Sequence, residues 1–276
     1  MPLVSLNGVS LYYEVHGHGL PLVFIPGIAV SHGMWAPQRD SFCKSHQVIL
    51  YDVRGTGRSS SLTWSCQVED LSRDLSQLLY HLGIKKAAIC GLSFGGVIAQ
   101  RFALDYPQKC GALILVDTFS ELSPRDLEEG ALWLMTWLAS PMFLMPKPWL
   151  TKMVLSYYRH WPLAVHCLEK EMQKVRGLDA MKTRWLVRKV NYTEELRSIS
   201  CPCLGIVGDR SNLAIRLMEK ITNAIGGATL QVVPQAFDPT SLSQREAFDK
   251  LVSQFLFRHW YSLPYSTVVT SSRPFT

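Results

Sequence analysis

A serine lies at the centre of a short glycine-bounded segment that could present a nucleophile. Residues 91–95 read Gly-Leu-Ser-Phe-Gly, with Ser93 in the middle, and they follow the apolar run Ala87 to Cys90. The residues after Gly95 are mostly small and apolar, which favours a helix. Glycines let backbones pass closely around a strained serine, and the positive end of the helix dipole favours developing negative charge. We therefore predict a strand-to-helix turn that presents the Ser93 hydroxyl for covalent chemistry.

The elements that would position this serine alternate along the chain. Seven short apolar runs have the length and boundaries of strands: Val9 to Glu14, Leu22 to Ile25, Val48 to Tyr51, Ala87 to Cys90, Ala112 to Val116, Leu204 to Val207 and Leu230 to Val233. Helical patterns include leucines on one face of residues 71–82 before Gly83, residues 213–225, and a last helix that begins with a capping box at 243–246. This alternation predicts an α/β protein with a mostly parallel central sheet and helices on both faces.

Two further segments make the chain resemble the α/β-hydrolase family over nearly its whole length. Residues 22–28 look like the family's strand and oxyanion loop, with Pro26 where a histidine is common. Residues 51–59 match the family's Asp-x-Arg-Gly-x-Gly-x-Ser turn, whose role there is chiefly structural. The resemblance implies an α/β-hydrolase fold in which the backbone N–H groups of Ile28 and Phe94 stabilise an oxyanion beside the nucleophilic serine.

The other two catalytic positions depart from the family pattern. The family carries an acid after the strand that here reads Leu204 to Val207, but Ser211 occupies the acid position. It carries a histidine after the last strand, where this chain has Asp238, and no histidine lies between His166 and His259. A serine hydroxyl is a weak nucleophile until a base takes its proton, so the ordinary triad is absent from this sequence.

Other residues could supply the missing acid or base. Asp117 follows a predicted strand where some family members carry an alternative acid, and Asp209 lies two residues before Ser211. His32 lies in the loop after the oxyanion segment, although a histidine in such a loop is more often structural. Asp238 could itself act as the base if burial under an apolar cap raised its pKa, which suits proton abstraction from a bound substrate better than acyl transfer.

Residues 120–190 interrupt the alternation with a helical, tryptophan-rich insertion. We predict a core domain of residues 1–119 and 191–261, a helical cap or lid of residues 120–190, and a disordered tail of residues 262–276. We expect most methionine and tryptophan side chains of the cap to pack inside it, with some lining a substrate cavity. Residues 145–190 hold ten lysines and arginines against three acidic residues. Such a surface could attract an anionic substrate, a carrier protein or an acidic membrane, but we favour charges that keep the helices solvated.

Composition indicates a globular protein that we expect in the cytoplasm. The chain has 276 residues, of which 47% are hydrophobic, and neither a signal-peptide pattern nor a transmembrane segment is evident. Seven scattered cysteines suit reduced thiols, and Cys201 and Cys203 lack the neighbours that a zinc site needs. We expect no metal ion, no cofactor and no nucleic acid as a partner.

Two classes of function remain open. The first is an α/β-hydrolase-family enzyme that cleaves a small hydrophobic ester, lactone or thioester through Ser93 with an unconventional acid or base. A variant of it is a non-hydrolytic proton transfer or cyclisation in the same pocket, with Asp238 as acid or base. The second is a catalytically inactive member that binds a ligand or a protein. We expect a small hydrophobic substrate as partner, with an added anionic group as an open alternative because of the basic segment.

Overall fold

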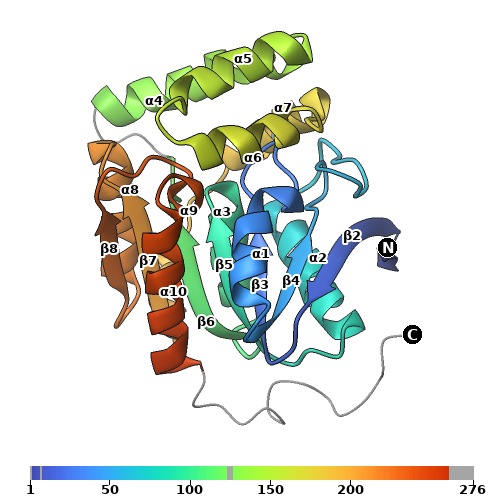
Figure 1. Cartoon of the computed structure of the whole chain (residues 1–276), viewed down its shortest axis with the longest axis vertical. Coiled ribbons are helices and arrows are strands. Elements are labelled where there is room, and N and C mark those ends of the chain that lie inside the picture. Colours follow the sequence, from blue (N-terminus) through green and yellow to red (C-terminus); the bar gives the residue numbers. More distant parts are fainter. Residues whose placement is uncertain (1, 7, 123–126, 261–276) are drawn as a thin grey trace.

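The computed structural model describes residues 2–6, 8–122 and 127–260, and a twisted central sheet runs through them (Figure 1). The described strands are β1 (Leu3–Leu6), β2 (Val9–His16), β3 (Leu20–Ile25), β4 (His46–Tyr51), β5 (Ala87–Leu92), β6 (Cys110–Val116), β7 (Cys203–Gly208) and β8 (Thr229–Val233). Their order is β1-β2-β4-β3-β5-β6-β7-β8. The β1–β2 and β2–β4 pairs are antiparallel and all the others are parallel, so the mostly parallel sheet predicted from the alternation is confirmed.

The seven predicted strands are all present, each extended by one or two residues at an end. β1 was not predicted. It is four residues long and lies at the edge of the sheet, where only Val4 is buried, so its pattern is too short to be distinctive.

Helices cover both faces of the sheet, which is why its central strands read as continuous apolar runs. On one face lie α2 (Val68–His81), α3 (Phe94–Asp105) and α8 (Asn212–Ala224), and on the other lie α1 (Ala36–Phe42) and α10 (Arg245–His259). Two consecutive residues of β3 show the division. Val23 packs in the core on the face covered by α2, α3 and α8, and Phe24 packs in the core on the face covered by α1 and α10.

A helical layer covers the end of the sheet at which the parallel strands finish (Figure 1). It consists of α4 (Leu127–Leu138), the 3₁₀ helix η2 (Ser140–Leu144), α5 (Lys147–Tyr157), α6 (Pro162–Met172) and α7 (Gly177–Val187). We propose this layer as the cap. Of the tryptophans and methionines that we expect mostly to pack inside it, Met135, Trp149 and Trp185 are exposed. Met135 and Trp149 lie on α4 and α5, the outermost helices of the layer. The predicted tail, residues 262–276, falls outside the described residues.

Three short elements complete the described chain: η1 (His32–Trp35), η3 (Glu195–Ser198) and α9 (Thr240–Ser243). The predicted capping box at residues 243–246 is wrong, because α10 begins at Arg245 without a side-chain cap. The Ser243 hydroxyl instead donates to the carbonyl oxygen of Phe237 at 2.7 Å and accepts from its N–H at 3.1 Å. Ser243 therefore fixes the loop that carries Asp238. No helix in the described part of the chain is long and apolar enough to cross a bilayer.

Candidate active site

Ser93 occupies the sharp turn between β5 and α3, in a strained backbone conformation with φ 51° and ψ −117°. Its N–H donates to the carbonyl oxygen of Val116 at 2.8 Å, and its own carbonyl oxygen accepts from the Thr118 hydroxyl at 2.6 Å. These bonds hold the serine backbone between β6 and the residues that follow it. None of the described residues hydrogen-bonds to Ser93 Oγ, which lines a cavity.

Close packing around the turn explains the two glycines that bound it. A Cβ atom at Gly91 would overlap the carbonyl oxygen of Gly95, and a Cβ atom at Gly95 would overlap the carbonyl oxygen of Ile25. Strand β3, strand β5 and helix α3 can therefore meet at this point only if both positions lack side chains.

Two backbone N–H groups lie beside the serine. Phe94 follows it directly as the first residue of α3, and Ile28 lies in the loop after β3. A Cβ atom added to Gly27 would be 3.5 Å from the Ser93 Cβ atom, so this loop passes within van der Waals distance of the turn. In the part of the chain that the structure describes, neither the Ile28 nor the Phe94 N–H has a hydrogen-bond acceptor. Two unused donors and a hydroxyl thus border the same cavity.

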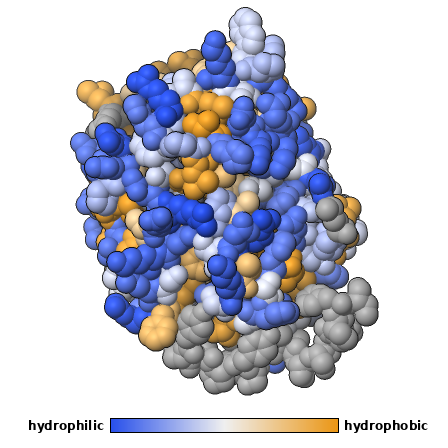
Figure 2. Space-filling model, in the orientation of Figure 1, coloured by the Kyte–Doolittle hydropathy of each residue, from blue (hydrophilic) through white to orange (hydrophobic). Residues whose placement is uncertain are grey.

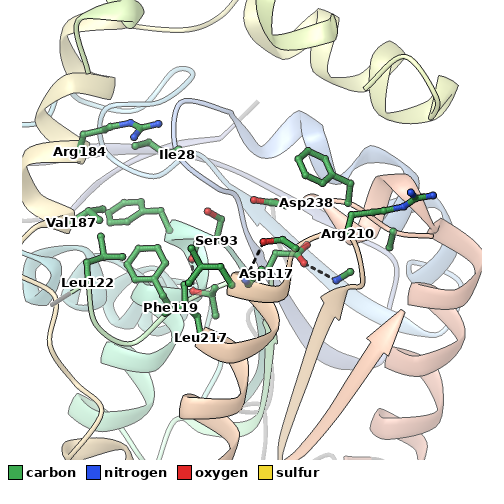
Figure 3. Close-up of a pocket in the computed structure, with 18 residues that line it drawn as sticks. Ile28, Ser93, Asp117, Phe119, Leu122, Arg184, Val187, Arg210, Leu217 and Asp238 are labelled. Carbon is green, nitrogen blue, oxygen red and sulfur yellow. Dashed lines mark hydrogen bonds between the residues drawn. The ribbon is translucent and has the colours of Figure 1, made fainter. Parts of the chain in front are cut away.

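The cavity has a volume of about 390 Å³ and lies between the sheet and the helical layer. Figure 3 shows Ser93, Asp117 and Asp238 at its centre, with Phe119 and Val187 among the apolar side chains to one side. No histidine is among the described residues that line it. The structure therefore brings the predicted serine together with two of the predicted carboxyl groups.

Asp117 lies at the end of β6 with φ 45° and is almost fully buried. Its Oδ1 accepts hydrogen bonds from the Gly208 N–H at 3.2 Å and the Thr240 hydroxyl at 2.9 Å, and its Oδ2 accepts from the Thr240 N–H at 2.7 Å. Burial raises the pKa of Asp117 to about 6, although these three donors act to lower it. The carboxyl group is fixed in place, and its burial moves its pKa upward from the usual range of an aspartate.

Asp238 faces the same cavity, where its side chain is accessible, and no described residue pairs with its carboxyl group. Enclosure by the surrounding protein, followed by the neighbouring Asp117 charge, raises the pKa of Asp238 well above its usual value. Water in the cavity moderates the first of these effects, because the side chain is open to that space. Asp238 is thus a solvent-accessible carboxyl group that lines the same cavity as the Ser93 hydroxyl.

Two aromatic residues of the helical layer pack on the loop that carries Asp238, and no catalytic motif marks either of them. Trp161 stacks on Phe237 with ring centroids 5.8 Å apart and planes 13° apart, and its Nε1 donates to the carbonyl oxygen of Gln235 at 3.2 Å. Tyr158 also packs on Phe237 at 5.8 Å. Burial raises the pKa of Tyr158, and the charges of Asp238 and Asp117 raise it further. The phenol therefore stays protonated near both carboxyl groups.

Ser211 lines the cavity but its hydroxyl is occupied elsewhere. Its Oγ accepts a hydrogen bond from the Ala214 N–H at 3.1 Å and so caps the first turn of α8. Asp209 is exposed and lies 4.0 Å from the Arg210 guanidinium, and it is not among the residues that line the cavity.

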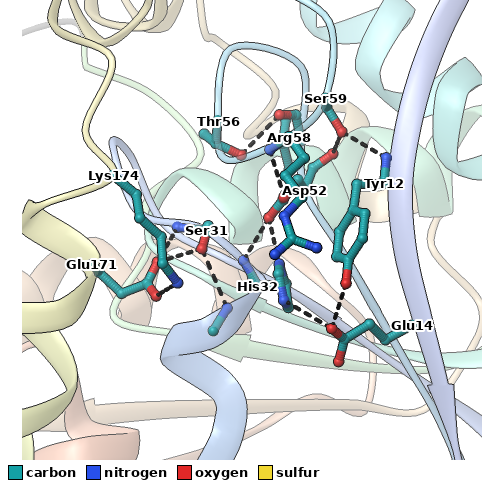
Figure 4. A network of polar contacts seen from close by, with 12 residues as sticks. Tyr12, Glu14, Ser31, His32, Asp52, Thr56, Arg58, Ser59, Glu171 and Lys174 are labelled. Carbon is teal, nitrogen blue, oxygen red and sulfur yellow. Dashed lines mark hydrogen bonds and ion pairs between the residues drawn. The ribbon is translucent and has the colours of Figure 1, made fainter. Parts of the chain in front are cut away.

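His32 does not reach the cavity but belongs to a separate polar network (Figure 4). Its Nδ1 is 2.6 Å from Asp52 Oδ1, and its Nε2 is 3.3 Å from Glu14 Oε1. Burial alone would raise the pKa of Asp52, but the bonds from His32 and from the Arg58 N–H lower it. The histidine therefore ties the loop after β3 to the turn after β4, and it lies away from Ser93.

A buried carboxylate from the helical layer accepts hydrogen bonds from the loop after β3. Glu171 of α6 is 2% exposed, and its Oε2 accepts from the Ser31 N–H at 2.7 Å and the Ser31 hydroxyl at 2.5 Å (Figure 4). Its Oε1 accepts from Lys174 Nζ at 2.7 Å. Because Ser31 is three residues from Ile28, the helical layer and the Ile28 loop are held together by charge-assisted hydrogen bonds.

Comparisons with known proteins agree with this geometry. The family model described as alpha/beta hydrolase fold matches residues 21–194, and the chain belongs to that family. A relative from Caulobacter sp. (strain K31), named putative carbamate hydrolase RutD, is 28% identical over 266 residues, which cover 90% of this chain and 96% of the relative. A relative of the same name from Azorhizobium caulinodans is 35% identical over 117 residues, which span only 42% of this chain and 44% of the relative.

Solved structures share the whole architecture. A hydrolase from Pseudomonas aeruginosa PA01 has a TM-score of 0.81 at 25% identity, covering 92% of this chain and 97% of its own. The enol-lactonase from Burkholderia xenovorans LB400 also has a TM-score of 0.81, at 22% identity, covering 93% of this chain and 100% of its own, and that likeness shows the fold alone. The relatives and the Pseudomonas neighbour place the chain among enzymes of hydrolase type.

Proposed function

We propose that this protein hydrolyses a small, largely apolar ester, lactone or thioester through Ser93, with Asp238 as the acid and base. One observation carries the proposal: among the described residues, the Ser93 hydroxyl shares a cavity with a carboxyl group that has no hydrogen-bond partner, and two backbone N–H groups without an acceptor border that cavity. Hydroxyl, base and oxyanion donors are the three parts that acyl transfer needs.

In the proposed reaction the Asp238 carboxylate takes the hydroxyl proton as Ser93 Oγ attacks the substrate carbonyl carbon. The negative charge that develops on the carbonyl oxygen accepts hydrogen bonds from the Ile28 and Phe94 N–H groups, close to the positive end of α3. The protonated Asp238 then gives its proton to the departing alcohol or thiol. Water, deprotonated by Asp238, attacks the acyl-serine; the bond between the acyl carbon and Ser93 Oγ then breaks, Oγ takes the proton back from Asp238, and the acid product leaves.

The raised pKa of Asp238 supports its role as the base, because an ordinary carboxylate is too weak to activate a serine hydroxyl. Asp117 supports the same role through its charge, which makes Asp238 harder to ionise and therefore more basic. We assign Ser211 a structural role in this proposal, because its hydroxyl accepts a hydrogen bond from the backbone of α8.

The cavity lining supports a mostly apolar substrate. Phe119, Leu122, Val187 and Leu217 provide hydrophobic surface, and a volume of about 390 Å³ suits a small molecule. The lining also includes Arg184 and Arg210, which leaves room for a substrate with an anionic group. Because relatives are named putative carbamate hydrolases, carbamates belong among the first substrates to assay.

A second candidate is proton transfer without hydrolysis. None of the described hydrogen bonds joins Asp238 to Ser93, so the carboxylate is equally placed to take a proton from a bound substrate. In that reaction the Ile28 and Phe94 N–H groups stabilise an enolate, and Ser93 forms no covalent bond.

A fluorophosphonate probe tests the proposed nucleophile. We expect the probe to label the native protein and the Ser211→Ala variant, and to leave Ser93→Ala unlabelled, as read by intact-protein mass spectrometry. Labelling that survives Ser93→Ala would assign the nucleophile elsewhere. A folded native protein that resists labelling would overturn hydrolysis through Ser93 and leave proton transfer or a binding function.

The double variant Asp238→His with Ser211→Asp restores the family's usual residues. It tests whether the native site is built for ester hydrolysis. Both proteins are assayed with a panel of esters, lactones, thioesters and carbamates. Hydrolysis of any of these compounds by the native protein supports the proposal. If ester hydrolysis appears only in the double variant, the native site was not built for that reaction.

A further inference from the structure

The cysteines of this protein are mostly buried, and the sulfur atoms of two of them are in contact. The face of the molecule in Figure 2 is largely hydrophilic, and five of the seven free thiols are buried. Cys43 and Cys201 are partly exposed. The Sγ atom of Cys201 is 3.7 Å from the Sγ atom of Cys110, which is 1% exposed. This pair therefore combines a thiol that a small reagent can reach with one that the protein encloses.

The two cysteines come from neighbouring segments at the starts of two parallel strands. Cys110 is the first residue of β6, and Cys201 lies in a bend two residues before β7. The Leu113 N–H donates to the carbonyl oxygen of Pro202 at 2.9 Å, so the segment before β7 is held alongside the start of β6. Sulfur atoms in a disulfide are about 2 Å apart, so the two atoms have to approach each other by less than that distance. Small rotations of the two side chains provide this movement, because Cys201 is outside the strand.

Cys201 is the more reactive member of the pair. Its contact with the Cys110 thiol lowers the pKa of Cys201, and the positive charge of Lys86, directly before β5, lowers it further against the opposing effect of burial. The same contact, together with burial, raises the pKa of Cys110. The thiolate is the form of cysteine that attacks an oxidant. Cys201 is therefore placed to react first, with the Cys110 thiol beside it.

We propose that Cys110 and Cys201 form a reversible disulfide when the protein meets a hydroperoxide. The Cys201 thiolate attacks one oxygen of the hydroperoxide, the O–O bond breaks, and the departing alkoxide or hydroxide takes a proton to become an alcohol or water. Cys201 is then a sulfenic acid, oxidised by two electrons. The Cys110 sulfur attacks the Cys201 sulfur, the S–O bond breaks, and the hydroxide leaves with the Cys110 proton as water. Two thiols and one hydroperoxide thus give one disulfide, one alcohol or water from the hydroperoxide, and one further water.

This disulfide closes the part of the chain that carries the helical layer. Residues 110 and 201 flank the insertion of α4 to α7 between β6 and β7. Near the other ends of these strands, the Gly208 N–H donates to Asp117 Oδ1 at 3.2 Å. The disulfide and this bond tie β6 to β7 at both ends, and the cross-link restricts the unfolded chain over a long loop. The modification adds stability and does not depend on the proposed reaction at Ser93.

Peptide mapping of the full chain tests the pairing. After treatment with hydrogen peroxide and alkylation of the remaining thiols, we expect a tryptic peptide of residues 110–125 joined to one of residues 198–210. Dithiothreitol should separate the two peptides. Cys203 lies in the second peptide, so the same link in Cys203→Ala assigns the bond to Cys201. Cys201→Ala should abolish the link, and Cys43→Ala, at the other partly exposed thiol, should leave it unchanged.

The rate of disulfide formation tests the reactivity of Cys201. Lys86→Gln should slow the reaction with hydrogen peroxide about threefold at neutral pH, because without the lysine charge less Cys201 is a thiolate. Lys85→Gln, at the exposed neighbouring lysine, is the matched control and should leave the rate unchanged.

Thermal unfolding measures the effect of the cross-link. The oxidised native protein should melt roughly 5 to 10 °C above the reduced protein, because the disulfide restricts the unfolded chain. Dithiothreitol should reverse this shift. Cys201→Ala should melt at the same temperature before and after peroxide treatment.

Three results would overturn the proposal: no link from residue 110 in folded, peroxide-treated protein, a link that disappears in Cys203→Ala, or sulfinic acid at Cys201 without a disulfide. Circular dichroism of each variant before peroxide treatment shows whether it is folded. Fragmentation of the linked peptides in the mass spectrometer locates the bond independently of the variants.

Discussion

The two halves of the proposed active site, the Ser93 turn and the Asp238 loop, are held by different parts of the molecule. Ser93 is fixed by hydrogen bonds to its backbone N–H and carbonyl oxygen and by glycines that admit no side chain. Asp238 is fixed by a loop on which Trp161 and Tyr158 pack from the helical layer. The first half keeps the family pattern and the second has lost it. Geometry set by the backbone admits few substitutions, whereas a loop held by side chains can change its chemistry while the fold persists.

The largest expected effect comes from removing the carboxylate of the second half. Asp238→Asn should lower kcat by about 10²- to 10⁴-fold, because the hydroxyl loses its base while the oxyanion donors remain. The control is Asp209→Asn, which removes an exposed carboxylate outside the cavity and should leave kcat nearly unchanged. Steady-state kinetics on any substrate found for the native protein provides the measurement. Full activity in Asp238→Asn would show that Asp238 is not the base of the reaction.

The next effect is a shift in pH dependence. The base works when ionised, so activity should rise with pH through the pKa of Asp238, well above the range of an ordinary aspartate. Asp117→Asn removes the neighbouring negative charge, which lowers the pKa of Asp238. The acidic limb of the kcat/KM profile should therefore move to lower pH. A limb that stays in place, or moves to higher pH, would show that the two carboxyl groups do not interact as described.

The smallest effect distinguishes a structural serine from a catalytic one. Ser211→Ala removes the N-cap of α8 and should cost about 1 kcal/mol of unfolding free energy. Urea unfolding measures this loss, and kcat should remain within about twofold of the native value because the hydroxyl takes no part in the reaction. A large fall in kcat without a loss of stability would return Ser211 to the catalytic machinery.

The sequence predicted most of the fold, because its signals are local. Each buried strand is a short apolar run between turns, and the turn at Ser93 depends on five consecutive residues. Sequence patterns were misleading where the same pattern is compatible with two different structures. Residues 243–246 satisfy the capping-box rule, but Ser243 bonds the loop at Phe237 instead. Tryptophan usually indicates a core, but Trp149 faces solvent.

The site was only partly predictable, because its parts meet through contacts far apart in the chain. Resemblance to the family pointed to Asp238 and Asp117, but their shared cavity with Ser93 depends on how three strands end together. Tyr158 directly follows α5 in a segment with no catalytic motif, and only the folded chain brings it near those carboxyl groups. His32 has the residue type expected of a base, yet Asp52 and Glu14 hold it outside the cavity.

The bond between Glu171 and Ser31 has a consequence for how this enzyme could be re-engineered. Exchanging the helical layer for that of a relative is an obvious way to alter substrate range. Here the exchange would also remove the carboxylate that anchors the Ile28 loop. A transplanted layer would have to bring its own acceptor for the Ser31 N–H and hydroxyl. In this chain one acidic residue of the helical layer therefore links that layer to the proposed oxyanion loop.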